Sequence, residues 1–143
     1  MTANDVTSLP PEFLRKGRFD EVWWVDLPNK TERAEVMKAS LRTHGRDKVK
    51  IDLAAVALAT EGFTGSEIAA IVPDALFAAF ADDGREITTK DLIDAAAKVV
   101  PLSKTAEEKI TAMRKWANGR ARFATKAETV DAPRSKRAVL DIA

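Results

Sequence analysis

The chain has 143 residues, of which 45% are hydrophobic and 31% charged, a composition typical of a folded globular protein rather than a disordered one. Its 23 lysines and arginines against 22 aspartates and glutamates give a net charge of +1, which provides no overall reason to expect binding to nucleic acid or to an anionic membrane. The lack of cysteine excludes disulfides and thiolate metal sites, and the single histidine argues against a structural zinc site.

The N-terminal part sets two arginines, Arg15 and Arg18, just ahead of an apolar run at residues 21–27 that predicts a β-strand. Guanidinium is always charged and can donate two parallel hydrogen bonds, so this pair suits phosphate recognition. A solvated basic turn is the alternative for an isolated pair of this spacing. The sequence has no secretory signal and no stretch long enough for a membrane helix, which predicts a cytoplasmic protein.

Two helices are predicted next, at residues 30–43 and from residue 53 to about residue 61. The first begins with the capping pair Asn29 and Glu32, and its buried face includes Met37 and Leu41, whereas Arg33 is expected to be solvated. The second is apolar on nearly every side, which predicts a short buried helix.

Three more helices follow, the first of them starting at the capping pair Thr64 and Glu67. Its expected apolar face consists of Ile68, Ile71, Val72, Ala75, Leu76, Ala79 and Phe80. Pro73 inside this helix removes a backbone hydrogen bond, so a kink is expected. The next helix begins with the capping pair Thr88 and Asp91 and covers residues 89 to about 100. A last helix runs from about residue 106 to about residue 118 with a cap at Thr105. Four helices joined by short loops, at residues 30–100, predict a mainly α fold, a small helical bundle.

Residues 2–21, TANDVTSLPPEFLRKGRFDE, resemble the second region of homology of AAA+ ATPases of the AAA subgroup. The resemblance implies catalytic roles for Asn4 as the sensor-1 residue, Arg15 as the arginine finger and Arg18 as the second arginine. In this family the finger reaches the γ-phosphate held by a neighbouring subunit and stabilises charge in the transition state.

Residues 62–68, GFTGSEI, resemble the sensor-2 region of the same family, which implies that Gly65 and Ser66 lie close to the adenine of ATP. A histidine in the position of His44 often contacts the ribose or the adenine in such proteins. The alternatives are an ordinary helix cap for Gly65 and Ser66, and for His44 a surface residue favoured by the negative end of a helix dipole. Residues 101–124 resemble the C-terminal extension of a group of bacterial, phage and plastid AAA proteins.

The resemblance implies a remnant of the α/β core at 1–28, a helical lid at 29–104 and a C-terminal helix at 105–124. The mixed charge and weak periodicity of residues 125–143 predict a flexible tail. The phosphate-binding pattern G-x-x-x-x-G-K-[ST] is absent, and so is an apolar strand ending in Asp-Glu that would hold Mg²⁺. Both are expected ahead of residue 1, so we expect a piece of a longer ATP hydrolase that is inactive alone.

The implied parent is a ring ATPase, a hexamer, that couples ATP hydrolysis to remodelling of a macromolecular substrate. A stand-alone helical protein-interaction domain without nucleotide activity is the alternative, and a nucleic-acid binder with a basic tail is a third hypothesis that the net charge does not favour. The strand at 21–27 has no sheet to join, so it is expected either to dock on the lid or, by preference, to form a dimer through these strands.

Overall fold

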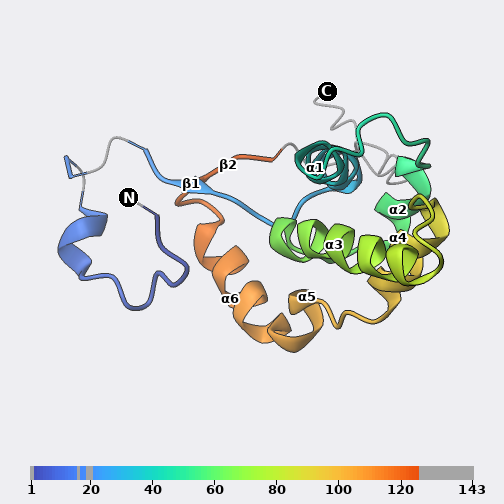
Figure 1. Cartoon of the computed structure of the whole chain (residues 1–143). Coiled ribbons are helices and arrows are strands. Elements are labelled where there is room, and N and C mark those ends of the chain that lie inside the picture. The colour runs from blue at the N-terminus through green and yellow to red at the C-terminus, as the bar shows by residue number, and fades with distance from the viewer. Residues whose placement is uncertain (1, 16, 19–20, 126–143) are drawn as a thin grey trace, which may run out of the picture.

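The computed structural model describes residues 2–15, 17–18 and 21–125. Its elements are the 3-10 helix η1 (Pro11–Leu14), the strands β1 (Trp23–Trp24) and β2 (Arg122–Phe123), and the helices α1 (Lys30–Thr43), α2 (Leu53–Ala59), α3 (Gly65–Ala81), α4 (Thr89–Ala97), α5 (Leu102–Thr105) and α6 (Glu107–Ala117). Figure 1 shows α1 to α4 gathered at one end, the N-terminal segment with η1 at the other, and β1, β2 and α6 between them. The predicted mainly α fold with a short strand is confirmed.

The three predicted capping boxes are present and place the starts of α1, α3 and α4. In each box a side-chain oxygen accepts the third helical amide, and the acidic side chain at that position accepts the amide of the cap residue; the pairs are Asn29 with Glu32, Thr64 with Glu67, and Thr88 with Asp91. These bonds satisfy amides that have no partner inside the helix. The first helix therefore has the predicted bounds, while α2 and α4 end earlier than predicted, at Ala59 and Ala97.

The core lies between α1, α2, α3 and α4. Its buried members are Met37, Leu41, Val56, Phe63, Ile68, Ile71, Val72, Ala75, Ile87, Leu92, Ala95 and Ala96. Most are the residues that the helical periodicity predicts, because positions three and four apart share one face.

Helix α3 continues past Pro73, and a contact from α1 compensates for the missing amide. Proline has no N–H, so the carbonyl of Ala69, four residues earlier, loses its intrahelical donor. The hydroxyl of buried Ser40 on α1 donates to this oxygen at 3.3 Å. The bond from Ser40 to Ala69 therefore joins α1 to α3. The kink expected at Pro73 stays a prediction.

Four expectations about the helices are wrong. Arg33, expected to be solvated, is buried. Phe80 is 76% exposed, because it lies one position beyond the inward stripe that ends at Ala79. Helix α2 is buried on one side only, and Leu58 is 62% exposed. Thr105 does not cap the last helix: it ends the short helix α5, where its hydroxyl donates to the carbonyl of Leu102, and α6 begins without a side-chain cap.

The N-terminal strand is not left without a partner. β1 pairs in parallel with β2, with Trp23 opposite Arg122 and Trp24 opposite Phe123. The strand is thus shorter than predicted and joins the segment after α6, rather than the bundle, because that segment returns alongside it (Figure 1). Self-association through residues 21–27 stays a prediction. Residues 126–143 of the predicted flexible tail lie outside the described residues.

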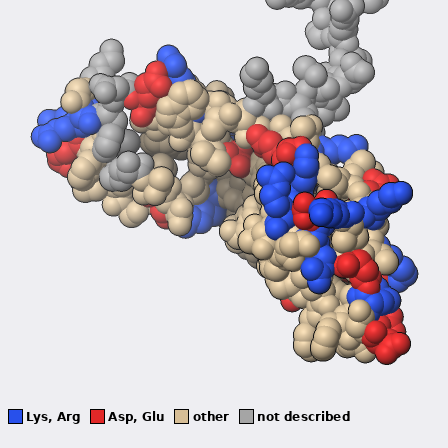
Figure 2. Space-filling model, turned by 45° about the horizontal axis from the view of Figure 1, so that its top comes forward, with Lys and Arg blue, Asp and Glu red and all other residues tan. Residues whose placement is uncertain are grey.

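Charged side chains of both signs are interspersed over the face of the molecule seen in Figure 2. A mixed surface of this kind does not produce the single-sign field that attracts nucleic acid.

Candidate functional site

Two of the predicted ligand-binding segments meet where α1 packs on α3. His44 caps the end of α1, and its Nδ1 lies 2.8 Å from the carbonyl oxygen of Ser40. The hydroxyl of the same serine donates to Ala69 on α3. His44 follows Ser40 by one turn, and Gly65 precedes Ala69 by one turn, so each lies about 6 Å along its helix from the shared contact. The Ser40–Ala69 contact thus joins the two helices one turn from His44 and one turn from Gly65.

The start of α3 offers backbone donors to a ligand. The first intrahelical bond runs from the amide of Ile68 to the carbonyl of Thr64, and the Thr64 hydroxyl accepts the amide of Glu67 at 3.2 Å. The amides of Gly65 and Ser66 come before these bonds, where a helix has no internal acceptor for them. A Cβ built on Gly65 would meet nothing within 4 Å, and Gly65 does not have a positive φ. The fold of the described residues therefore gives no steric reason for glycine here, whereas close approach of a ligand would be one.

Helix α5 rests against the loop that leads into α3. The second carboxylate oxygen of Glu67 accepts the amide of Leu102 at 2.8 Å. A Cβ on Gly62 would come within 2.5 Å of the Ser103 hydroxyl oxygen. The segment after the bundle thus fixes the loop 62–64 from its far side. The sequence does not predict this contact, because Glu67 and Leu102 are far apart in the chain and no local pattern links them.

The predicted catalytic residues lie elsewhere. Arg15 follows η1, and the amide of Arg18 donates to the Arg15 carbonyl at 3.2 Å in a turn that contains Gly17 at a φ of +93°. Both arginine side chains are exposed, and neither forms an ion pair among the described residues. Asn4 is also exposed. In Figure 1 this N-terminal segment lies at the end of the molecule opposite the bundle, so these residues do not meet His44, Gly65 or Ser66 within one chain.

Asp5 fastens the first residues to α6. Its carboxylate accepts the hydroxyl and the amide of Thr7, at 2.6 and 2.9 Å, and lies 3.2 Å from Nζ of Lys109. The Thr7 hydrogen bonds, helped by Lys109, lower the pKa of Asp5 to about 2. The charged form is therefore the one that this turn stabilises.

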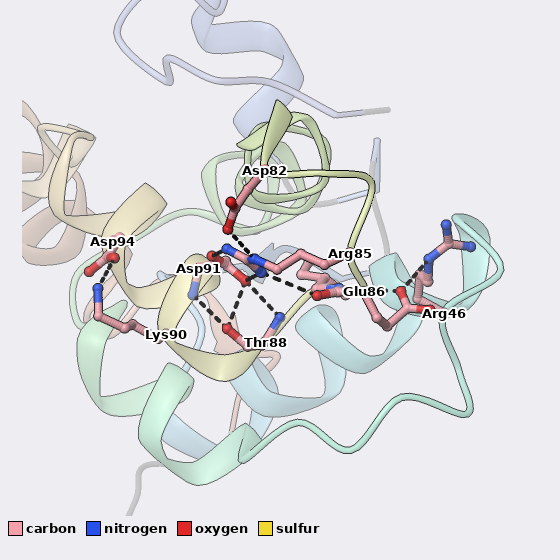
Figure 3. A network of polar contacts seen from close by, with 9 residues as sticks. Arg46, Asp82, Arg85, Glu86, Thr88, Lys90, Asp91 and Asp94 are labelled. Carbon is pink, nitrogen blue, oxygen red and sulfur yellow. Dashed lines mark hydrogen bonds and ion pairs between the residues drawn. The ribbon is translucent and has the colours of Figure 1, made fainter. Parts of the chain in front are cut away.

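A polar network connects the end of α3 to the start of α4 (Figure 3). Arg85 holds both carboxylate oxygens of Asp91, at 2.7 and 2.8 Å, and also pairs with Asp82. These hydrogen bonds from Arg85 hold the pKa of Asp91 well below its usual range and raise the pKa of Arg85. A second ion pair, Arg46 with Glu86, adjoins the network. Because Arg85 bridges Asp82 at the end of α3 and Asp91 in the first turn of α4, we interpret the network as a support for the α3–α4 turn.

Among the described residues there is no group of three or more His, Asp or Glu side chains that could hold a metal ion. Within the same part of the chain, no helix is both long and apolar enough to cross a membrane.

Comparison with known proteins identifies the bundle. Residues 50–94 match the family described as the AAA+ lid domain. The AAA domain-containing protein ycf46 of Pyropia yezoensis is 40% identical over 126 residues, which are 87% of this chain and 25% of that protein. The ATP-dependent zinc metalloprotease FtsH of Acidothermus cellulolyticus is 40% identical over 95 residues, or 64% of this chain and 14% of that protein.

A solved structure has the same fold. The FIGL-1 AAA domain, crystallised in complex with ADP, superposes with a TM-score of 0.57 at 19% identity, over 73% of this chain and 39% of that one. The chain spans about a quarter of the length of the ycf46 relative that it matches. The family match lies within the bundle, whereas the likeness to the ycf46 protein extends beyond it. The roles of individual residues stay predictions.

Proposed function

We propose that this chain, which carries an AAA+ lid domain, supplies that lid and a pair of arginines to a cytoplasmic ring ATPase of six subunits. The complete protein would couple ATP hydrolysis to remodelling of a macromolecular substrate. The chain itself would contribute the adenine side of one nucleotide site and the arginine side of the next.

The observation that carries the proposal is the start of α3. Its first two amides, those of Gly65 and Ser66, point away from any intrahelical acceptor, and open space surrounds the position where a larger residue than glycine would place its Cβ. His44 lies on the neighbouring helix, where an imidazole can donate to a ribose hydroxyl or a ring nitrogen. These residues would hold the nucleoside part of ATP, whose triphosphate supplies the reactive bond.

Arg15 and Arg18 fit a different role from the lid residues. They lie in an exposed turn at the opposite end of the molecule, without carboxylate partners among the described residues, so their charge is available to another molecule. A guanidinium directed at a phosphate held by the adjacent subunit would stabilise the negative charge that develops during phosphoryl transfer. Asn4 would act beside them as a polar residue that orients the reacting groups.

One feature favours the alternative, a helical domain that binds another protein without nucleotide. Phe77 and Phe80 on α3 are 75% and 76% exposed, more than an isolated bundle needs. Large exposed aromatic side chains are typical of interaction surfaces. Binding of nucleotide at His44, Gly65 and Ser66 distinguishes the two functions, because an interaction domain has no need of it.

The test is an NMR titration of the ¹⁵N-labelled chain with ATP. Amide shifts should move at His44, Gly65 and Ser66 with a dissociation constant in the millimolar range, about −4 kcal/mol, because only the nucleoside contacts are present. Gly65→Val should abolish these shifts without unfolding α3, since its side chain enters open space. Ala70→Val, on an exposed position of the same helix, should leave them unchanged. Shifts that are absent at millimolar ATP, or equal in both variants, would overturn the assignment of His44, Gly65 and Ser66 to nucleotide binding.

The arginine assignment needs a longer protein that carries these residues together with a phosphate-binding loop. There, Arg15→Ala or Arg18→Ala should lower turnover by roughly 10³-fold while nucleotide binding stays unchanged, as for arginine fingers generally. Mixing a finger variant with a variant of the phosphate-binding loop should restore part of the activity. If the mixed ring remains inactive, the arginines do not act between subunits.

A further inference from the structure

The segment after the bundle returns to the N-terminal strand and binds it along both backbone and side chains. The amides of Arg122 and Ala124 donate to the carbonyls of Val22 and Trp24, each at 2.9 Å. Arg122 also pairs with Glu21 at 2.8 Å, and its guanidinium lies 5.9 Å from the centre of the Trp23 ring. β2 is therefore attached to the strand by three different kinds of contact: backbone hydrogen bonds, an ion pair and a cation–π contact.

Helix α6 adds an ion pair at the end of that strand. Nε of Arg114 lies 3.0 and 2.8 Å from the two carboxylate oxygens of Asp26, and Nη2 lies 2.7 Å from Oδ1. The same oxygen accepts the amide of Leu27 at 2.7 Å. Burial raises the pKa of Asp26, but the hydrogen bonds from Arg114 and Leu27 outweigh it, so the pKa is lowered. Asp26 is thus held as a carboxylate in the link between β1 and α1.

The same returning segment also reaches the other side of this link. Glu32 on α1 accepts the amide of Asn29 at 3.0 Å, and its Oε2 accepts the hydroxyl of Thr125 at 3.3 Å. One continuous stretch, from Arg114 to Thr125, therefore contacts the strand before the link and the helix after it. In Figure 1 this stretch lies alongside β1 and reaches toward α1.

We propose that residues 107–125 form a strap across the link at residues 26–29, and that the strap fixes the orientation of the N-terminal segment relative to the bundle. Asp26 and Arg114 are its main positioning residues. Since Arg15 and Arg18 lie on the N-terminal segment, the strap also sets where these arginines stand relative to the lid. This role of the strap is separate from the proposed function and does not depend on nucleotide binding.

The absence of cysteine makes a direct distance measurement possible, because two introduced cysteines are the only sites that a thiol-directed spin label can modify. Glu12→Cys in η1 and Asp74→Cys on the exposed side of α3 place one label on each side of the link. Pulsed electron-electron resonance on the full chain then gives the distribution of distances between them. We expect a single narrow distribution when the strap is intact.

Arg114→Met should broaden this distribution about twofold or more, because loss of local contacts lets a segment sample further orientations. Arg120→Met is the matched control: Arg120 lies on the same stretch but donates to Trp116 in that stretch and not to the N-terminal segment. It should leave the distribution unchanged. In an Asp26→Asn background, Arg114→Met should add no further broadening, since the two residues act as one pair.

Amide hydrogen exchange checks that these variants stay folded. The amides of Arg122 and Ala124 should exchange about tenfold faster in Arg114→Met, while amides of α1 and α3 keep their rates, as expected for local opening. The proposal is overturned if Arg114→Met leaves the label distribution unchanged. Equal broadening in the Arg120 control, or additive broadening in the double variant, would also overturn it.

Discussion

Replacing Arg33 by methionine should destabilise the bundle strongly, although arginine on an amphipathic helix is ordinarily a surface residue. Only 8% of Arg33 is exposed. Its Nε donates to the carbonyl of Ala57 at 2.9 Å and Nη1 donates to the carbonyl of Pro28 at 3.0 Å. Ala57 is in the last turn of α2, where carbonyls lack intrahelical donors. The guanidinium therefore caps the end of α2 and, through Pro28, binds the segment just before α1.

The expected loss follows from these two bonds. Each hydrogen bond to a charged donor contributes about 1.5–3 kcal/mol, and removal of a buried charge returns part of the cost of its desolvation. The Thr60 hydroxyl also donates to the Ala57 carbonyl, but at 3.4 Å, so it replaces the lost bond only weakly. We therefore expect Arg33→Met, which keeps the apolar stem, to lower the free energy of unfolding by about 2–4 kcal/mol.

Urea unfolding followed by far-ultraviolet circular dichroism measures this difference. Lys38→Met on the exposed side of the same helix is the control, and it should change the free energy by less than about 0.5 kcal/mol, as surface substitutions usually do. If the two variants unfold at the same urea concentration, Arg33 does not support the bundle in the way described.

Three further outcomes are expected. Gly62→Ala should lower the free energy of unfolding by about 0.5–1.5 kcal/mol more than Gly45→Ala, because the new methyl group would displace the Ser103 side chain from its rotamer. Both glycines have positive φ, but only Gly62 lies against Ser103. If Ser103→Ala does not remove this difference in urea unfolding, α5 does not pack as described. Because the pKa of Asp91 is lowered in the folded chain, its carboxylate stabilises the fold above about pH 4, and this stabilisation is lost as the pH falls further. Arg85→Met should therefore weaken the fall of the urea midpoint at acid pH. An unchanged fall would show that Arg85 does not stabilise the Asp91 carboxylate. The chain alone should release no phosphate from ATP above a buffer blank, since its sequence lacks the phosphate-binding pattern; magnesium-dependent release would refute this.

Local signals in the sequence predict the bundle well. A capping box is a pattern of two residues three apart, and the three predicted boxes place three helix starts. Helical periodicity likewise identifies most of the core. These features depend on neighbours within one or two turns, so a single sequence contains the information that determines them.

Contacts between distant segments were not predictable in the same way. The position of Arg33 on α1 predicts a solvated side chain. Its burial depends on α2, which places the carbonyl of Ala57 within hydrogen-bond distance. Arg114 and Asp26 are far apart in the chain, and neither stands in a pattern that marks the other. The pairing of β1 with β2 involves two residues of each strand, too few for alternation to indicate a partner.

The two kinds of contact also differ in strength, and this difference determines how the molecule can move. The bundle encloses an apolar core in which Met37, Ile68 and Leu92 are completely buried. The strap is held by exposed polar groups: the pairs of Arg114 with Asp26 and of Arg122 with Glu21 leave from a fifth to two thirds of each side chain accessible. Exposed ion pairs contribute about 0–1 kcal/mol each, less than the burial of one large apolar side chain. We therefore expect opening of the strap to require less free energy than unfolding of the bundle, so that the strap fixes Arg15 and Arg18 less firmly than the core fixes the lid residues His44, Gly65 and Ser66.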